Sequence, residues 1–140
     1  MKIIPDVPDF SKLNIDMFDA LVVPGGIKGA RQFCSSESVL FTVRHMYNDN
    51  KIIGMICAGS LVAKMSRVHK GGKITGHPSV LEELTTDFDY VDERVVVDRN
   101  LVTSQGPGTA MLFSLMIVEV LAGREKRQEI SAPMILSSSL

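Results

Sequence analysis

Residues 51–59 read KIIGMICAG, an apolar run that leads straight into a cysteine and two small residues. A short apolar run without alternation is typical of a strand that is buried on both faces of a parallel sheet. The small residues after it allow a sharp turn into a helix. We therefore expect a strand-turn-helix unit that holds the Cys57 side chain at the carboxyl edge of the sheet, where open α/β folds place their ligands.

The segments around this unit alternate between strand and helix patterns. The apolar run within 16–24 predicts a strand that ends in a turn, and apolar residues at helical spacing predict helices over 36–48 and 61–68. Such alternation implies parallel strands joined by right-handed helical crossovers, which makes the expected fold an α/β sandwich.

The rest of the chain continues this pattern. In chain order we expect a short strand at 73–77, a short helix at 80–84, a hairpin of 94–97 and 101–104 around a three-residue loop, a largely buried helix at 110–121, a charged helical turn at 125–129 and a frayed tail at 137–140. No repeat or linker divides the sequence, so we expect one domain over 1–140.

The composition is that of an ordinary globular domain. The chain has 140 residues, 45% hydrophobic and 22% charged, with 15 basic and 16 acidic side chains and no block of either sign. This balance gives no electrostatic footprint for nucleic acid or an anionic membrane. No apolar run approaches the length of a membrane span, and the start lacks the apolar region of a signal peptide. Two cysteines without zinc-type spacing favour a reducing cytoplasmic location and no metal site.

The two cysteines have different neighbours. A helix N-terminus at Cys57 stabilises a thiolate, which is both a nucleophile and an oxidation target. The alternative is that Cys57 is a small apolar side chain in a buried corner, since free cysteines are often buried. Cys34 follows no strand and is expected in a loop or at a helix start, as a structural or merely exposed thiol.

Two glycines end the neighbouring strand. Backbone N–H groups of Gly25 and Gly26, together with that of Ala58, are placed to form an oxyanion hole beside Cys57. A plain turn is the alternative for such a glycine pair. The combination with a cysteine on a sharp turn favours the functional interpretation.

A histidine normally completes a nucleophilic cysteine site. His77 ends a predicted strand and is the candidate that reaches the carboxyl edge where Cys57 lies. A structural hydrogen bond explains His77 equally well. His45 lies within a helix and His69 near a helix end, where surface roles dominate.

Four motifs in register resemble those of one family. The sequence reads ALVVPGG at 20–26, MICAG at 55–59, GHP at 76–78 and LVTSQGPGT at 101–109. Together they resemble the ThiJ/PfpI superfamily, in the clade of the Parkinsonism-associated DJ-one proteins. The resemblance extends over essentially the whole chain.

The resemblance implies a flavodoxin-like (class I glutamine amidotransferase-like) three-layer sandwich with a mostly parallel sheet, which forms a homodimer. It implies Cys57 as nucleophile, with Gly25, Gly26 and Ala58 around the oxyanion. Family members act without a cofactor as glyoxalases or deglycases on methylglyoxal and glycation adducts. A non-enzymatic redox sensor or chaperone is the alternative, as is an inactive truncated form. A glutamine amidotransferase is disfavoured because no histidine follows His77.

Two departures from the family pattern concern the partners of the cysteine. Family members carry a glutamate at the end of their first strand, whereas residues 1–6 here resemble a later strand. A βαβ unit of roughly 30 residues thus has no counterpart, and we expect the chain to be part of a longer polypeptide or to be completed by a partner. The histidine of some members aligns near Asp87, and 87–90 contains no histidine.

Overall fold

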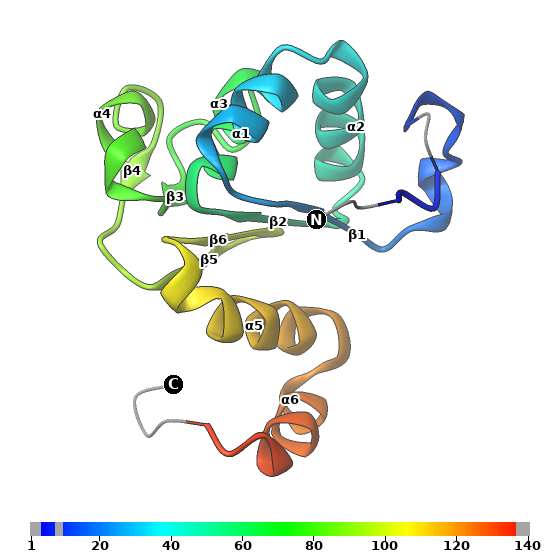
Figure 1. The fold of residues 1–140 in the computed structure, drawn as a ribbon, viewed down its shortest axis with the longest axis vertical. Helices are drawn as coiled ribbons and strands as arrows, with labels where there is room; N and C mark the ends of the chain where they lie inside the picture. Colours follow the sequence, from blue (N-terminus) through cyan, green and yellow to red (C-terminus); the bar gives the residue numbers. More distant parts are fainter. Residues whose placement is uncertain (1–3, 8–9, 137–140) are drawn as a thin grey trace.

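A computed structural model describes residues 4–7 and 10–136, and its centre is a four-stranded sheet (Figure 1). The strand order is β1-β2-β6-β5. β1 pairs with β2 and β2 with β6 in parallel, while β5 and β6 are antiparallel. The strands are β1 (Ala20–Val23), β2 (Ile52–Ile56), β5 (Val95–Asp98) and β6 (Leu101–Ser104).

Helices cover both faces of this sheet, so the expected three-layer α/β sandwich is confirmed. One face carries α1 (Ile27–Cys34), α2 (Glu37–Asn48) and α3 (Leu61–Ser66). The other face carries α5 (Ala110–Ala122), and α6 (Arg124–Ser131) packs beside it (Figure 1). Within the described part of the chain, no helix has the length and apolar character needed to cross a membrane.

The central position of β2 explains its unbroken apolar sequence. Ile53 and Met55 are fully buried, since β2 has a strand on each side and helices on both faces. All four residues of β6 are buried as well. Gly54 lets α5 approach the sheet, because a Cβ at this position would lie 2.8 Å from Cδ1 of Ile117. The core therefore fixes the carboxyl ends of β1, β2 and β6 at one edge.

A second, two-stranded sheet lies beside the first. It consists of β3 (Lys73–Ile74) and β4 (Asp89–Tyr90), which pair in parallel around α4 (Leu81–Leu84). The strand expected at 73–77 is thus shorter than predicted, and β4 was not predicted. Short 3₁₀ helices complete the fold: η1 (Phe10–Lys12), η2 (Ile15–Met17), η3 (Cys57–Ser60), η4 (Pro78–Val80), η5 (Pro107–Thr109) and η6 (Ala132–Met134).

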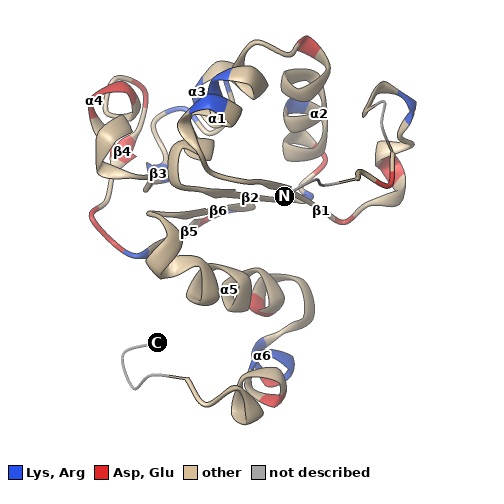
Figure 2. Cartoon of the chain, in the orientation of Figure 1, with Lys and Arg blue, Asp and Glu red and all other residues tan. Residues whose placement is uncertain are grey.

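The prediction that 110–121 is largely buried is wrong. Only Phe113 and Leu115 of α5 are buried, while Met111 and Leu121 remain 43% and 46% exposed. One face of the helix packs on β2 and β6, and α6 contacts only part of the rest. Glu119 is the one charged residue of α5 (Figure 2), and the exposed residues of the helix, which include Met111, Ser114 and Leu121, carry no charge.

Three smaller expectations are corrected. The hairpin turn has two residues, since Asp98 pairs with Leu101 and Arg99 adopts a left-handed φ of 54°. The charged turn at 125–129 is part of the longer helix α6. His69 is buried, not at the surface, because Tyr47 and Asp98 bind its two ring nitrogens. The tail expected to fray at 137–140 lies outside the described residues.

Candidate active site around Cys57

Cys57 lies at the sharp turn that the sequence predicts. It follows β2 directly, begins η3 and has a φ of 63°, in the left-handed region that residues other than glycine rarely adopt. Such a conformation costs about 1–3 kcal/mol and persists only where the surrounding structure enforces it. The residue is partly exposed. The turn therefore holds the thiol at the carboxyl edge of the sheet, within reach of solvent.

The end of β1 packs tightly against this turn. A Cβ added to Gly25 would lie 2.7 Å from Cβ and 3.4 Å from Sγ of Cys57, so only a glycine backbone fits there. In the same way, a Cβ on Gly59 would lie 2.7 Å from the carbonyl oxygen of Pro24. The turns after β1 and β2 therefore interlock through glycine, and the Gly25 backbone borders the sulfur.

The other two motifs reach the same edge. A Cβ on Gly76 would lie 3.2 Å from the carbonyl oxygen of Cys57, and one on Gly106 would lie 3.7 Å from Cδ2 of His77. Ile56 and Ser104 are paired at the ends of β2 and β6, which brings the 101–109 motif beside Cys57. Four segments that are distant in sequence therefore meet near the Cys57 turn.

The three backbone positions expected to bind an oxyanion lie in the turns that follow β1 and β2. Gly25 is in contact range of Cys57, as above. Gly26 has a φ of 93° and occupies the N-cap position of α1, where helix N–H groups begin. Ala58 follows Cys57 in η3 and is 2% exposed. The structure thus places Gly25 and Ala58 at the turn that carries Cys57 and Gly26 next to Gly25, and the oxyanion role of the three residues stays a prediction.

His77 has a structural partner. It is the N-cap of η4, and its Nδ1 accepts the backbone N–H of Ser79 at 3.2 Å and lies 2.8 Å from the Ser79 hydroxyl. An Nδ1 that accepts a hydrogen bond leaves the proton of a neutral ring on Nε2. No hydrogen bond joins His77 to Cys57 among the described residues. The geometry thus supports the structural interpretation of His77, and its catalytic role stays a prediction.

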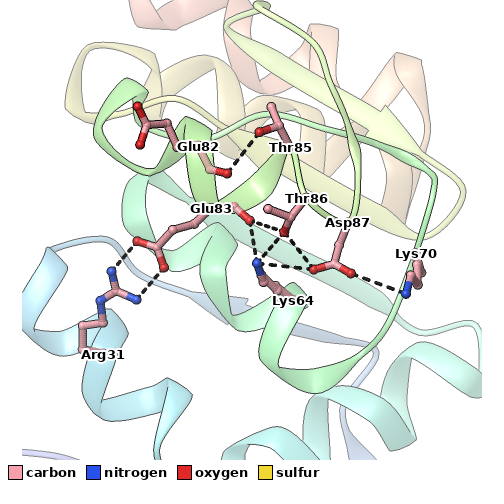
Figure 3. A network of polar contacts seen from close by, with 8 residues as sticks. All are labelled: Arg31, Lys64, Lys70, Glu82, Glu83, Thr85, Thr86 and Asp87. Carbon is pink, nitrogen blue, oxygen red and sulfur yellow. Dashed lines mark hydrogen bonds and ion pairs between the residues drawn. The ribbon is translucent and has the colours of Figure 1, made fainter.

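Asp87, at the position where some family members have a histidine, belongs to a different network. Its carboxylate lies 3.4 Å from Nζ of Lys64 and 3.6 Å from Nζ of Lys70 (Figure 3). The hydroxyl of Thr86 and these two lysines lower the pKa of Asp87. Asp87 is therefore a charged partner of two lysines and forms no hydrogen bond with Cys57.

Cys34 differs from Cys57 in exposure. It is the last residue of α1, a helix that the sequence patterns did not predict, and only 9% of it is exposed. Burial raises the pKa of the Cys34 thiol, which keeps it protonated. The expectation of a loop or helix start is corrected, and a structural thiol is what remains.

One group among the described residues has the spacing of metal ligands. Nε2 of His45 lies 3.1 Å from Asp16 and 3.2 Å from Asp49, each at a carboxylate oxygen. All three side chains are at the surface, where such distances are also those of ordinary ion pairs. No hydrogen bond or ion pair among the described residues joins them to Cys57.

A three-layer α/β sandwich with a cysteine on a sharp, left-handed turn between β2 and a helix has the geometry of the strand-turn-helix elbow found in α/β proteins. Comparison with known proteins makes the assignment specific. A sequence model of the DJ-1/PfpI family matches residues 1–120, and the chain belongs to this family.

Named relatives share much of the sequence. The chain is 45% identical over 127 residues to a Schizosaccharomyces pombe protein described as "Glutathione-independent glyoxalase DJ-1", a match that covers 89% of this chain and 64% of that protein. It is 37% identical over 138 residues to the Drosophila melanogaster protein dj-1beta, which covers 98% of this chain and 73% of that one. The chain thus spans about two thirds to three quarters of the length of these relatives.

Solved structures confirm the flavodoxin-like fold. The crystal structure of Drosophila melanogaster DJ-1beta superposes with a TM-score of 0.92 at 37% identity, over 98% of this chain and 74% of that chain. Schizosaccharomyces pombe DJ-1 superposes with a TM-score of 0.84 at 39% identity, over 94% of this chain and 70% of that one.

Proposed function

We propose that Cys57 is the nucleophile of a cofactor-independent glyoxalase-type reaction on methylglyoxal or a similar small carbonyl compound. The observation that carries this proposal is the strained, partly exposed thiol of Cys57 against the Gly25 backbone. A protein 45% identical to this chain is described as a glutathione-independent glyoxalase, which supports the same chemistry. Early glycation adducts present related carbonyl groups and are the alternative substrates of the same thiol.

The reaction requires a thiolate and a site for a negative oxygen. The thiolate of Cys57 adds to the aldehyde carbon of methylglyoxal, and the carbonyl oxygen becomes an oxyanion that takes up a proton. That carbon then gives up its hydrogen as a proton to solvent, its electron pair forms a double bond to the neighbouring carbon, and the former ketone oxygen takes up a proton, which gives an enediol. A proton then adds to the neighbouring carbon while the hydroxyl on the first carbon loses its proton and becomes a carbonyl, which leaves a lactate thioester. Water hydrolyses the thioester, releases lactate and restores the thiol.

Backbone groups supply the oxyanion site in this proposal. N–H groups of Gly25, Gly26 and Ala58 are held by the turns that follow β1 and β2, so they need little reorganisation when charge develops. Donors fixed in this way are worth about 10²–10³ in rate each in known oxyanion holes. In this scheme His77 positions the 76–80 turn beside the thiol and transfers no proton.

Oxidation is a second use of the same thiol, favoured by the contrast between a partly exposed Cys57 and a buried Cys34. In that case peroxide transfers one oxygen to the thiolate, which becomes a sulfenate, and the peroxide is reduced to water. A redox sensor needs this step and no carbonyl turnover.

Lactate formation from methylglyoxal tests the proposal. Wild-type protein is compared with Cys57→Ser, and Cys34→Ser is the matched control for the loss of one thiol. We expect Cys57→Ser to lose lactate formation and Cys34→Ser to keep it. Equal rates for wild type and Cys57→Ser would refute the proposed enzyme function and leave oxidation as the chemistry of Cys57.

A further inference from the structure

A cavity separate from the Cys57 turn lies between the end of α1, α2, α3 and the segment before β3. Its volume is about 650 Å³, and none of the residues that line it belongs to the candidate active site. Its walls include Leu40, Val68 and Phe88, which are buried. Cavities of this size accommodate small organic ligands, and an apolar wall provides contact for a hydrocarbon or aromatic body.

The mouth of the cavity is positively charged. Four cationic and two acidic side chains line it, and Lys and Arg residues lie on the helices around it (Figure 2). The cationic ones are Arg44, Lys64, Arg67 and Lys70; the acidic ones are Glu37 and Asp87. Like charges gathered at one concave site repel one another and create a positive potential that attracts anions.

Internal partners neutralise one side of this cluster. Lys64 donates to the carbonyl oxygen of Glu83 at 2.8 Å and pairs with Asp87, which Lys70 also approaches (Figure 3). The negative charge of Asp87 therefore offsets part of the positive charge of the two lysines. It does not offset the charges of Arg44 and Arg67, the other two cationic residues of the cavity.

The two arginines lack an acidic partner within the described residues. Nε of Arg44 is 3.5 Å from the carbonyl oxygen of Leu40, a neutral group, and Arg67 forms no ion pair there. Arg67 ends α3 with a left-handed φ of 57°, a position where glycine is usual. A strained arginine at the mouth of a cavity, without a carboxylate, has two parallel N–H donors available for an anion.

We propose that this cavity binds a small organic anion, with its phosphate or carboxylate group at Arg67 and Arg44 and its apolar body against Val68 and Phe88. Phosphate and carboxylate share the geometry that a guanidinium recognises, so both belong to the proposed ligand class. The site does not use Cys57 and is independent of carbonyl chemistry.

The test is a titration of the ¹⁵N-labelled protein with phenyl phosphate, followed by amide chemical shifts. Benzyl alcohol is the uncharged probe of similar shape, inorganic phosphate lacks the ring, and benzoate carries a carboxylate. Arg67→Gly removes the guanidinium at a backbone position that glycine prefers. Arg99→Gly is its matched control, because Arg99 is exposed, has a left-handed φ of 54° and lies in the hairpin turn away from the cavity.

Phenyl phosphate is expected to shift amides in 64–70 and in α2 saturably, and more tightly than inorganic phosphate, whereas benzyl alcohol leaves them unchanged. Arg67→Gly should weaken phenyl phosphate binding roughly tenfold, as the loss of one bidentate charge-assisted contact does. Arg99→Gly should change it less than about twofold, since a distant exposed charge is screened. Tighter binding of phenyl phosphate than of benzoate assigns the phosphate, the reverse order assigns the carboxylate, and either supports the proposal.

Three results would overturn the proposal. The first is the absence of saturable shifts around the cavity. The second is equal weakening by Arg67→Gly and Arg99→Gly, which reports net charge only. The third is binding of a hexa-aspartate peptide without any response to phenyl phosphate, which would assign the basic surface to a protein partner. None of these measurements depends on methylglyoxal turnover. The proposed function and the proposed anion site can therefore be refuted independently of each other.

Discussion

Gly25→Ala is the substitution that most sharply tests the packing of the Cys57 turn. The added methyl carbon would lie 2.7 Å from Cβ of Cys57 and 3.1 Å from the carbonyl oxygen of Ile56. Carbon atoms in contact lie at about 3.5–4.0 Å, so two backbone segments must separate by close to an ångström. Overpacking of this kind typically costs about 1–3 kcal/mol.

Gly29→Ala is the matched control. Gly29 lies within α1, four residues after Gly25, and a Cβ there would meet no atom within 4 Å. Alanine is better than glycine in a helix by about 0.5–1 kcal/mol, so this variant should be more stable than wild type. The same chemical change is therefore expected to have opposite signs at two nearby positions.

Urea denaturation measures both effects. With a slope of about 1–3 kcal/mol per molar, a loss near 2 kcal/mol lowers the midpoint for Gly25→Ala by roughly 1 M. Lactate formation should fall in Gly25→Ala and stay at the wild-type level in Gly29→Ala, because only Gly25 borders the thiol. A Gly25→Ala protein as stable and as active as wild type would refute the account of this turn.

Two further predictions concern other titratable groups. Asp98→Asn should cost about 1–3 kcal/mol, because Asp98 accepts the Lys73 N–H at 2.8 Å and partners the buried His69. The hydrogen bond from the Lys73 N–H is the main cause that lowers the pKa of Asp98 from its usual value of 3.8. A carboxyl group whose pKa is lowered by folding stabilises the folded protein fully at neutral pH, and this stabilisation is lost as the pH falls below about 4. Wild type should therefore lose more stability than Asp98→Asn in urea titrations between neutral pH and pH 3, and parallel losses would contradict the assignment. In dilute peroxide, peptide mass spectrometry should find oxygen on Cys57 before Cys34, whose burial keeps it a thiol; earlier oxidation of Cys34 would reverse the ranking.

The strand-turn-helix unit at 51–59 was predictable because all of its signals agree. The apolar run, the cysteine and the following small residues each favour a buried strand and a sharp turn, and β2 and η3 have this form. The meeting of the turns after β1 and β2 at one edge also followed from the rule that neighbouring parallel strands end at the same edge of a sheet. Patterns within one segment and the rules for parallel sheets suffice for these features.

Features that depend on distant partners were not predictable. The helix α1 was missed because it spans only eight residues and contains Gly29, although its apolar residues at 27, 30, 33 and 34 have helical spacing; it packs against α3. His69 is buried through Tyr47 and Asp98, which are 22 and 29 residues away in sequence. The sequence of α5 predicts a buried helix because nearly all of its residues are apolar. Composition alone does not indicate how many other elements cover a helix, so its exposed side could not be predicted.

Chemical titration of the candidate nucleophile is the most direct test of the central claim that Cys57 performs the carbonyl chemistry. Limited iodoacetamide is added to wild-type protein, and lactate formation and the alkylated fraction of each cysteine are measured on the same samples. We predict that activity falls in proportion to alkylation of Cys57, while Cys34 is still unmodified. Activity that survives complete alkylation of Cys57 would contradict the account.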